Sequence, residues 1–337
     1  MKWLIAVLML AVMLAAGNAS AAAELKRFEF TGVEMAVGVK IVLYAADDST
    51  ANAAAKSAMA EIRRLNQIFS DYDPNSELRR LCNTATEGSA VVVSRDLWLV
   101  LKQSAELSRR SEGAFDVTVG PVVRLWRRAR RRGKLPVPER LNPAKELVGY
   151  RYVRLNEQKH SVELEKSGMR LDLGGIAKGY AADAALKVIT KADIKSALID
   201  FGGDIVLGDR PPEREGWRIA IAPLEAEGKP SRFLTLSNVA IATSGDAWQF
   251  VEIDGRRYSH IVDPRTGLGL SDHSSVTVIA PTGMQADSLA SAVSVLGPEK
   301  GIKLIESTTD AAVLIISSPD GKKAEEFKSS RWPADRP

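Results

Sequence analysis

Cysteine is almost absent from this chain of 337 residues, which contains only Cys82. A single thiol excludes an intrachain disulfide and a cysteine-based metal cluster. Stability must therefore come from a hydrophobic core, which a composition of 45% hydrophobic residues can supply. Cys82 follows a predicted helix among polar residues, and nothing nearby marks it as an activated nucleophile. The sequence thus disfavours a cysteine–histidine–aspartate catalytic set.

Long hydrophobic runs are absent after the first 23 residues. Lys2 precedes an apolar stretch from Trp3 to Ala16, and small residues with an Ala-Ser-Ala pattern at positions 19–21 follow it. This pattern predicts a signal peptide over residues 1–21 and a mature chain over residues 22–337. The alternative is an uncleaved anchor helix, for which the stretch is short. Since no cysteine lies near the cleavage site, we expect an exported, periplasmic protein that is not a lipoprotein and has no membrane span after cleavage.

A strong excess of one charge is also lacking. The formal net charge is +4, and removal of Lys2 with the signal peptide leaves +3, which is too mild to indicate a nucleic-acid partner. The most basic run extends from Arg127 to Lys134. It can be interpreted as an electrostatic clamp for phosphates or an acidic partner, or as a solvated helix end before a Pro-rich loop. We favour the second interpretation because charge runs are usually solvated.

Regular alternation of strands and helices is absent as well, which favours an α+β fold with mixed or antiparallel sheets and packed helices. No repeat or clean domain break divides residues 22–337, so we expect one domain, with two lobes around the site as the alternative. The first half of the chain is predicted to contain a strand pair over 28–44, a helix from a Thr50 cap to Phe69 and a helix after Ser94. A further helix carries an apolar stripe of Ile176, Tyr180, Ala184 and Val188. The last predicted elements are a hairpin at Asp254-Gly255, a helix over 285–296 and a marginal polar tail from Lys322.

Residues 171–183 are the first stretch with a chemical signature. They read as a strand ending in Asp172, a turn at Gly174 and Gly175, and the start of a helix. A helix N-terminus favours phosphate, and the Asp172 carboxylate could hold a divalent cation that bridges the same phosphates. An ordinary strand-to-helix connection with small residues fits the stretch equally well.

Residues 281–291 are the second stretch. Thr282 and Gln285 form a capping-box pattern, so Asp287 and Ser291 fall on one helical face near the positive end. A carboxylate and a hydroxyl in this arrangement could share one Mg²⁺. Taken alone, the pattern is better explained by an acidic first turn that complements the helix dipole.

His260 is one of only three histidines and lies on a predicted strand before an Asp-Pro turn. A histidine that titrates near neutral pH is suited to act as a general base, although a structural histidine on a strand face is an equal alternative. His160, in a hairpin loop, and His273, in a polar segment, look structural.

Together these stretches resemble the signature segments of the ApbE-like family, the FAD:protein FMN transferases. The resemblance runs in the family's order from about Met35 to Leu296. Its further segments are Phe-Ser-Asp-Tyr-Asp-Pro-Asn-Ser-Glu-Leu at 69–78, Gly-Ala-Phe-Asp-Val-Thr-Val-Gly-Pro at 113–121, Ile-Asp-Phe-Gly-Gly-Asp at 199–204 and Ile-Ala-Thr-Ser-Gly-Asp at 241–246.

The resemblance implies an ApbE-like, T-fold-related architecture and a Mg²⁺-dependent activity. FMN would pass from FAD to a Thr or Ser hydroxyl of a partner flavoprotein, with release of AMP. His260 would be the base, and the Ala177 carbonyl, Asp287 and the Ser291 hydroxyl would bind Mg²⁺. The residues expected around FAD are Met35, Tyr72, Ala114, Phe115, Asp116, Gly174, Lys178 and Ile261.

Two residues depart from the family pattern. Met35 is followed by Ala-Val where Gly-Thr is common, and Ser291 stands where threonine is usual. Two rival functions use the same site: hydrolysis of FAD to FMN and AMP, and FAD binding without catalysis.

Overall fold

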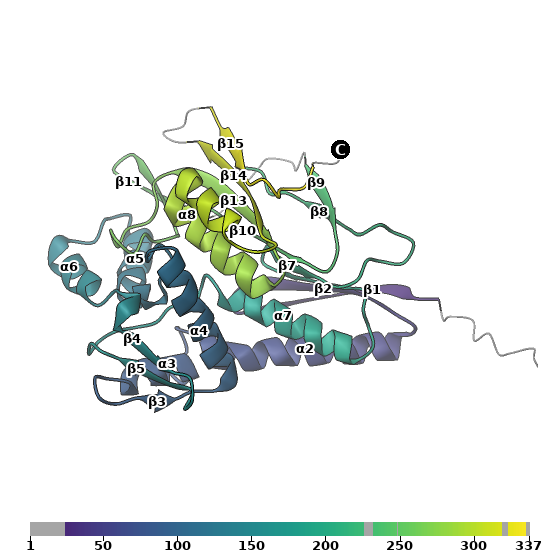
Figure 1. Cartoon of the computed structure of the whole chain (residues 1–337), viewed down its shortest axis with the longest axis horizontal. Coiled ribbons are helices and arrows are strands. Elements are labelled where there is room, and N and C mark those ends of the chain that lie inside the picture. Colours follow the sequence, from purple (N-terminus) through teal and green to yellow (C-terminus); the bar gives the residue numbers. More distant parts are fainter. Residues whose placement is uncertain (1–23, 226–231, 248, 319–322, 335–337) are drawn as a thin grey trace, which may run out of the picture.

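A single open sheet of eight strands forms the centre of the molecule (Figure 1). The computed structural model describes residues 24–225, 232–247, 249–318 and 323–334. The predicted signal peptide lies outside these residues. All neighbouring strands of the sheet are antiparallel, and helices pack against it, so the predicted α+β class is confirmed. In spatial order the strands are β1 (Lys26–Glu34), β2 (Val37–Ala45), β6 (Ala197–Phe201), β7 (Asp204–Leu207), β10 (Ala240–Gly245), β13 (His273–Ala280), β14 (Ala312–Ser318) and β15 (Glu325–Lys328).

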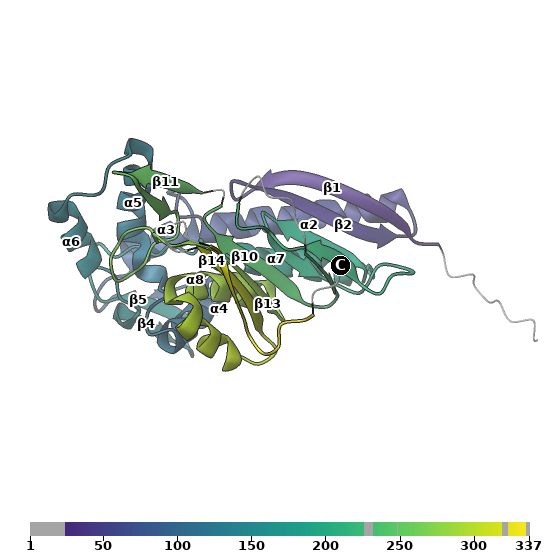
Figure 2. The ribbon, with the colours of Figure 1, turned by 90° about the horizontal axis from the view of Figure 1, so that it is seen from above.

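Three long helices cover one face of this sheet: α2 (Asp48–Phe69), α7 (Ala177–Lys191) and α8 (Gly283–Glu306) (Figures 1 and 2). Asp47, rather than the predicted Thr50, caps α2, because its carboxylate accepts the Thr50 amide hydrogen at 2.8 Å. Helix α8 runs beyond the predicted end at residue 296, with a kink at Gly297. The largest core cluster lies between these helices and the sheet.

The predicted stripe of α7 is only part of its buried surface. Ile176 is buried, and Tyr180, Ala184 and Val188 pack half-buried against the main core, but most fully buried positions are alanines and Gly179. Helix α7 contacts α2, α8 and the sheet, so it is enclosed on several sides. Small residues allow this close packing, and a single stripe of large apolar residues is therefore not required.

A second, smaller core lies on the opposite face of the sheet. The hairpin of β8 (Trp217–Ala220) and β9 (Phe233–Leu236) covers it, and Trp332 near the C-terminus packs into it. The tail expected to be marginal thus supplies both the edge strand β15 and a buried aromatic residue.

The remaining elements lie beside the sheet, at the end where α7 and α8 begin (Figure 1). They are α3 (Glu77–Thr84), β3 (Val91–Val92), α4 (Arg95–Arg110), η1 (Val117–Val119), α5 (Gly120–Arg132), α6 (Pro138–Glu146), η2 (Tyr150–Tyr152), β4 (Val153–Asn156), β5 (Ser161–Leu164), β11 (Phe250–Ile253) and β12 (Arg256–Ser259). Cys82 lies within α3 rather than after a helix, and burial raises the pKa of its thiol, which agrees with an inert cysteine.

A third apolar cluster joins α5 to the β11–β12 hairpin. Trp126 is buried there, with its ring centroid 5.6 Å from that of Tyr258, and its indole N–H donates to the Ser259 carbonyl at 3.0 Å. This contact fixes α5 next to the residue that follows β12, His260. Within the described ranges, the structure contains no helix with the length and apolarity needed to cross a bilayer.

Candidate active site

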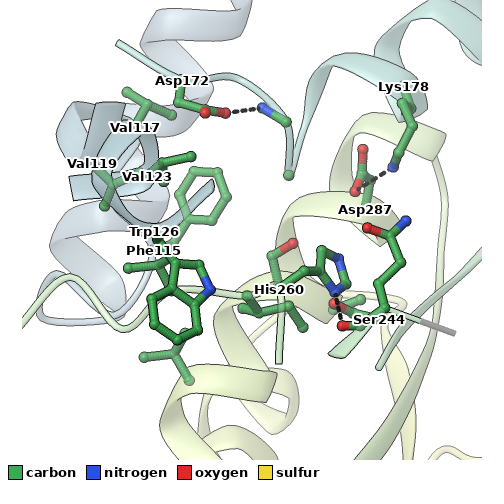
Figure 3. A pocket seen from close by; sticks show the side chains of 18 of the residues that line it. Phe115, Val117, Val119, Val123, Trp126, Asp172, Lys178, Ser244, His260 and Asp287 are labelled. Atoms are coloured by element: carbon green, nitrogen blue, oxygen red, sulfur yellow. Dashed lines mark hydrogen bonds and ion pairs between the residues drawn. The ribbon is translucent and has the colours of Figure 1, made fainter. Parts of the chain in front are cut away.

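A cavity of about 530 Å³ opens where α5, the first turns of α7 and α8, and the segment after β12 come together (Figure 3). Its lining combines apolar side chains such as Phe115 and Trp126 with ionisable groups. Ten of the twelve residues predicted at the site line the cavity: Tyr72, Ala114, Phe115, Asp116, Gly174, Lys178, His260, Ile261, Asp287 and Ser291. Segments far apart in sequence therefore converge as the motifs suggested.

The other two predicted residues do not line the cavity. Met35 lies in the two-residue turn between β1 and β2, where it and Ala36 both have positive φ, and its side chain packs against the main core. Ala177 is the buried first residue of α7. A carbonyl oxygen has two lone pairs, so the Ala177 carbonyl can accept a helical hydrogen bond and retain one position for a ligand.

Lys178 and two buried carboxylates form the charged centre of the cavity. The ammonium of Lys178 makes a close ion pair with Asp204 and lies 3.5 Å from Oδ1 of Asp287. Burial disfavours the charged lysine, but the two carboxylates outweigh this effect and raise its pKa. Burial and the neighbouring Asp287 raise the pKa of Asp204 to about 7, so a further cation bound here would favour the ionised form of that carboxylate.

The surroundings of Asp287 fit a magnesium ion. Its Oδ2 accepts the Gly179 amide hydrogen at 3.1 Å, which fixes the carboxylate between the starts of α7 and α8. Ser291 lines the cavity one turn further along α8, and a Cβ at Gly175 would approach its Oγ to 2.7 Å. No cluster of three or more His, Cys, Asp or Glu side chains suited to a metal occurs in the described ranges. Mg²⁺ needs fewer protein ligands, because it takes its remaining oxygens from water and substrate phosphates.

The Gly174–Gly175 turn differs from its prediction. Oδ1 of Asp172 accepts the Gly174 amide hydrogen at 2.9 Å, and Oδ2 pairs with Arg127 at 2.8 Å. Both oxygens of Asp172 thus already have partners in the protein, although Arg127 is shared with Asp71. Cation binding by Asp172 stays a prediction. The amides of Ile176 and Ala177 donate to the Leu173 carbonyl, so part of the predicted phosphate-binding turn is also occupied.

His260 lies directly after β12 rather than on a strand. Its Nδ1 lies 3.2 Å from the Gln249 carbonyl, which can only accept, so Nδ1 carries the hydrogen and Nε2 is left with a free lone pair. Burial and the nearby Arg130 lower the pKa of His260 to about 4. The imidazole is consequently neutral at physiological pH and can accept a proton.

Aromatic rings and a fixed loop complete the cavity. Tyr72 is 74% exposed, and the Arg127 guanidinium lies 4.4 Å from its ring centroid. Buried Phe115 also lines the cavity and precedes Asp116, whose carboxylate accepts hydrogen bonds from Thr118 and from the Tyr150 amide. These bonds fix the loop, and burial raises the pKa of Asp116.

Three further charged residues belong to this region although none was predicted as a site residue. Asp204 ends a Gly-Gly-Asp motif and makes the closest contact with Lys178. Asp183 caps α8 by accepting the amide hydrogens of Gly283 at 2.7 Å and Met284 at 2.9 Å, and burial raises its pKa to about 6. Arg130 lines the cavity from α5. The sequence feature that points to Asp183 and Asp204 as site residues is that each carboxylate ends a glycine-containing motif.

Comparison with known proteins identifies the family of this chain. The model of the ApbE family matches residues 35–315. The chain belongs to the ApbE family. Two relatives named FAD:protein FMN transferase are similar along most of their length. The Haemophilus influenzae protein is 32% identical over 333 residues, covering 95% of this chain and 96% of the relative. The Vibrio cholerae protein is 34% identical over 285 residues, covering 82% and 84%.

Solved ApbE structures have the same fold. The flavin transferase ApbE from Vibrio cholerae matches with a TM-score of 0.80 and 29% identity, covering 91% of this chain and 98% of that one. The flavinyl transferase ApbE from Pseudomonas stutzeri, in its apo form, matches with a TM-score of 0.80 and 28% identity, covering 91% and 96%. The ApbE-like architecture expected from the motifs is thereby confirmed.

Proposed function

We propose that this ApbE-family chain transfers FMN from FAD to a Thr or Ser hydroxyl of a partner flavoprotein, with release of AMP and dependence on Mg²⁺. The observation that carries this proposal is the cavity itself, in which a neutral His260 and the Asp287–Ser291 pair line one space. FAD:protein FMN transferase is also the name of its relatives.

The reaction requires a base, an attacking hydroxyl and a leaving phosphate. Nε2 of His260 accepts the hydroxyl proton while the hydroxyl oxygen bonds to the phosphorus that carries FMN. The bond between that phosphorus and the oxygen of the AMP phosphate breaks, and AMP leaves. Lys178, a further proposed FAD neighbour, pairs with Asp287 and so holds that carboxylate at the site, and Tyr72 offers an aromatic surface for the isoalloxazine ring.

The metal site in this proposal consists of Asp287, the Ser291 hydroxyl and the Ala177 carbonyl. Bound Mg²⁺ would supply Lewis-acid stabilisation of the phosphate oxygens. Met35, Ala114, Phe115, Asp116, Gly174 and Ile261 are the further proposed FAD neighbours. For Met35 this requires FAD to extend beyond the cavity lining towards the β1–β2 turn.

We also propose that the mature chain is exported and acts on periplasmic or membrane-facing flavoproteins. Residues 1–21 carry this proposal through their sequence pattern alone. N-terminal sequencing of the protein from the cell envelope tests it, because a mature terminus at Ala22 is expected and an intact Met1 would contradict it.

The decisive experiment measures AMP released from FAD by the purified mature protein, with Mg²⁺ and then with EDTA. Each condition is run with and without an acceptor domain that contains a threonine site. Metal-dependent AMP together with a covalently flavinylated acceptor supports transfer. Free FMN and AMP without covalent product would indicate hydrolysis, and tight FAD binding without AMP would indicate a binding protein.

A further inference from the structure

Arg130 differs from the other lysine and arginine side chains that line the cavity. Lys178 is neutralised by Asp204 and Asp287, and Arg127 is neutralised by Asp71 and Asp172. Arg130 makes no ion pair or hydrogen bond with any residue that the structure describes, although it is half-buried in the cavity wall. A positive charge without an acidic partner at this position is available to an anionic ligand.

The charge of Arg130 continues onto the outer surface of α5. Arg131 lies one turn after Arg127, near the exposed Tyr72 ring, and Arg124 lies one turn before it. Both arginines are exposed, and neither has an ion-pair partner among the described residues. We call Arg124, Arg130 and Arg131 the α5 basic edge. It extends from the cavity wall, where Arg130 lies, to the exposed side of the helix, where Arg124 and Arg131 lie.

We propose that the α5 basic edge binds an acidic segment of the acceptor protein, and so guides the acceptor hydroxyl to the cavity. This inference rests on the proposed function, since it concerns the protein substrate of the same site. The acceptor must approach the cavity, and charges within about 8 Å of each other interact at physiological ionic strength. Arginine and tyrosine are also the residue types enriched where protein interfaces are strongest.

A lipid surface fits α5 less well. A helix that lies on a membrane needs an exposed apolar face opposite its basic face. The apolar side of α5 is buried in the protein, with Val122, Trp126 and Ala129 all in the third cluster. Its arginines are therefore better placed to bind a protein than to anchor the helix in a bilayer.

The helix provides its own matched control. Arg131 and Arg132 are both exposed arginines in the last turn of α5. Replacement of either by glutamate changes the charge equally and has a similar cost against the helix dipole. Arg132 lies about 140° around the helix from Arg127, away from the cavity side. Only Arg131→Glu should thus affect docking.

Fluorescence anisotropy with FAD present tests the proposal directly. The probes are a labelled peptide whose single threonine is flanked by glutamates and a twin with glutamines at those positions. We expect the glutamate peptide to bind about tenfold more tightly at low salt, with a smaller preference at about 0.15 M salt. Arg131→Glu should remove this preference and Arg132→Glu should retain it. Equal binding of both peptides to the wild type, or equal losses in both variants, would overturn the proposal.

Two further measurements separate the remaining explanations. Binding to phosphatidylglycerol vesicles that Arg131→Glu abolishes, without discrimination between the peptides, would assign the edge to lipid and refute acceptor docking. Covalent transfer to both peptides with equal efficiency would retain the transferase function and refute the docking edge. Selective binding of the glutamate peptide without transfer or AMP release would retain the edge and refute the transferase.

Discussion

His260 combines the geometry and the protonation state of a general base. Its Nδ1 is held by the Gln249 carbonyl, so Nε2 is the free nitrogen. We predict that His260→Ala binds FAD like the wild type but loses transfer about 10²- to 10⁴-fold, the range in which general bases contribute. Single-turnover flavinylation and FAD titration measure the two quantities separately. Unchanged transfer would remove His260 from the mechanism.

The lowered pKa of His260 has its own consequence for pH dependence. An exposed histidine would lose its basic form below about pH 6.5, whereas burial and Arg130 keep His260 neutral down to about 4. We therefore expect kcat/KM to be insensitive to His260 protonation between about pH 5.5 and 8. In Arg130→Ala one of the causes of the shift is lost, so the acidic limb should move to higher pH. An acidic limb near 6.5 in the wild type would contradict this assignment.

Asp287 is predicted to hold the metal. Asp287→Ala should abolish Mg²⁺-dependent AMP release, because the carboxylate between the starts of α7 and α8 is removed. Calorimetric FAD binding should become insensitive to Mg²⁺ in this variant. Ser291→Ala should weaken the metal dependence, while Ser291→Thr keeps a hydroxyl and should retain it. If Asp287→Ala released AMP at the wild-type rate, the assignment of Asp287 as a metal ligand would be wrong.

Helices α7 and α8 cross with almost no side chain between them. A Cβ at Gly179 would lie 2.0 Å from the Gly283 carbonyl oxygen. Gly179→Ala must therefore separate the helices, and overpacking of this kind costs about 1–3 kcal/mol or more. We expect a Tm lowered by several degrees in calorimetry, together with weaker FAD binding. Gly38→Ala is the control, because its Cβ would meet nothing within 4 Å and its melting temperature should stay near the wild-type value.

The sequence predicts elements well where local chemistry decides them. The Asp254-Gly255 hairpin is confirmed because both residues adopt the positive φ of a tight hairpin turn, at 52° and 75°. Thr282 caps α8 as its sequence pattern indicates. Tertiary contacts decide the rest: the inner side of α7 depends on what encloses the helix, and the pairing of Asp172 with Arg127 joins residues that no local pattern connects.

For the site, too, local patterns predict some features and tertiary contacts decide the others. Ten of the twelve residues that the family resemblance implied line the cavity, whereas glycine turns and capping patterns by themselves mark only where α7 and α8 begin. They do not reveal that Lys178 lies between two carboxylates, or that Arg130 lies among the lining residues. Both facts depend on how α5, α7 and α8 approach one another, which no single segment encodes.

At the scale of the whole molecule, the C-terminal tail closes the second core. Trp332 is 9% exposed within this cluster, and its indole N–H has no hydrogen-bond partner among the described residues. We predict that Trp332→Ala lowers the free energy of unfolding by up to about 3 kcal/mol, at the low end for a buried tryptophan. Urea denaturation measures this loss. Trp332→Phe should remain near wild type, and equal stability of all three proteins would show that the Trp332 side chain is dispensable.

The close approach of Gly179 and Gly283 also bears on when the protein becomes competent to bind its ligand. Asp287 receives its Gly179 hydrogen bond only after two distant parts of the chain have met, and contacts of long sequence separation form slowly. A chain still emerging from the ribosome lacks this contact. Such a chain should neither capture FAD nor modify a protein. Folding would therefore act as the enzyme's switch.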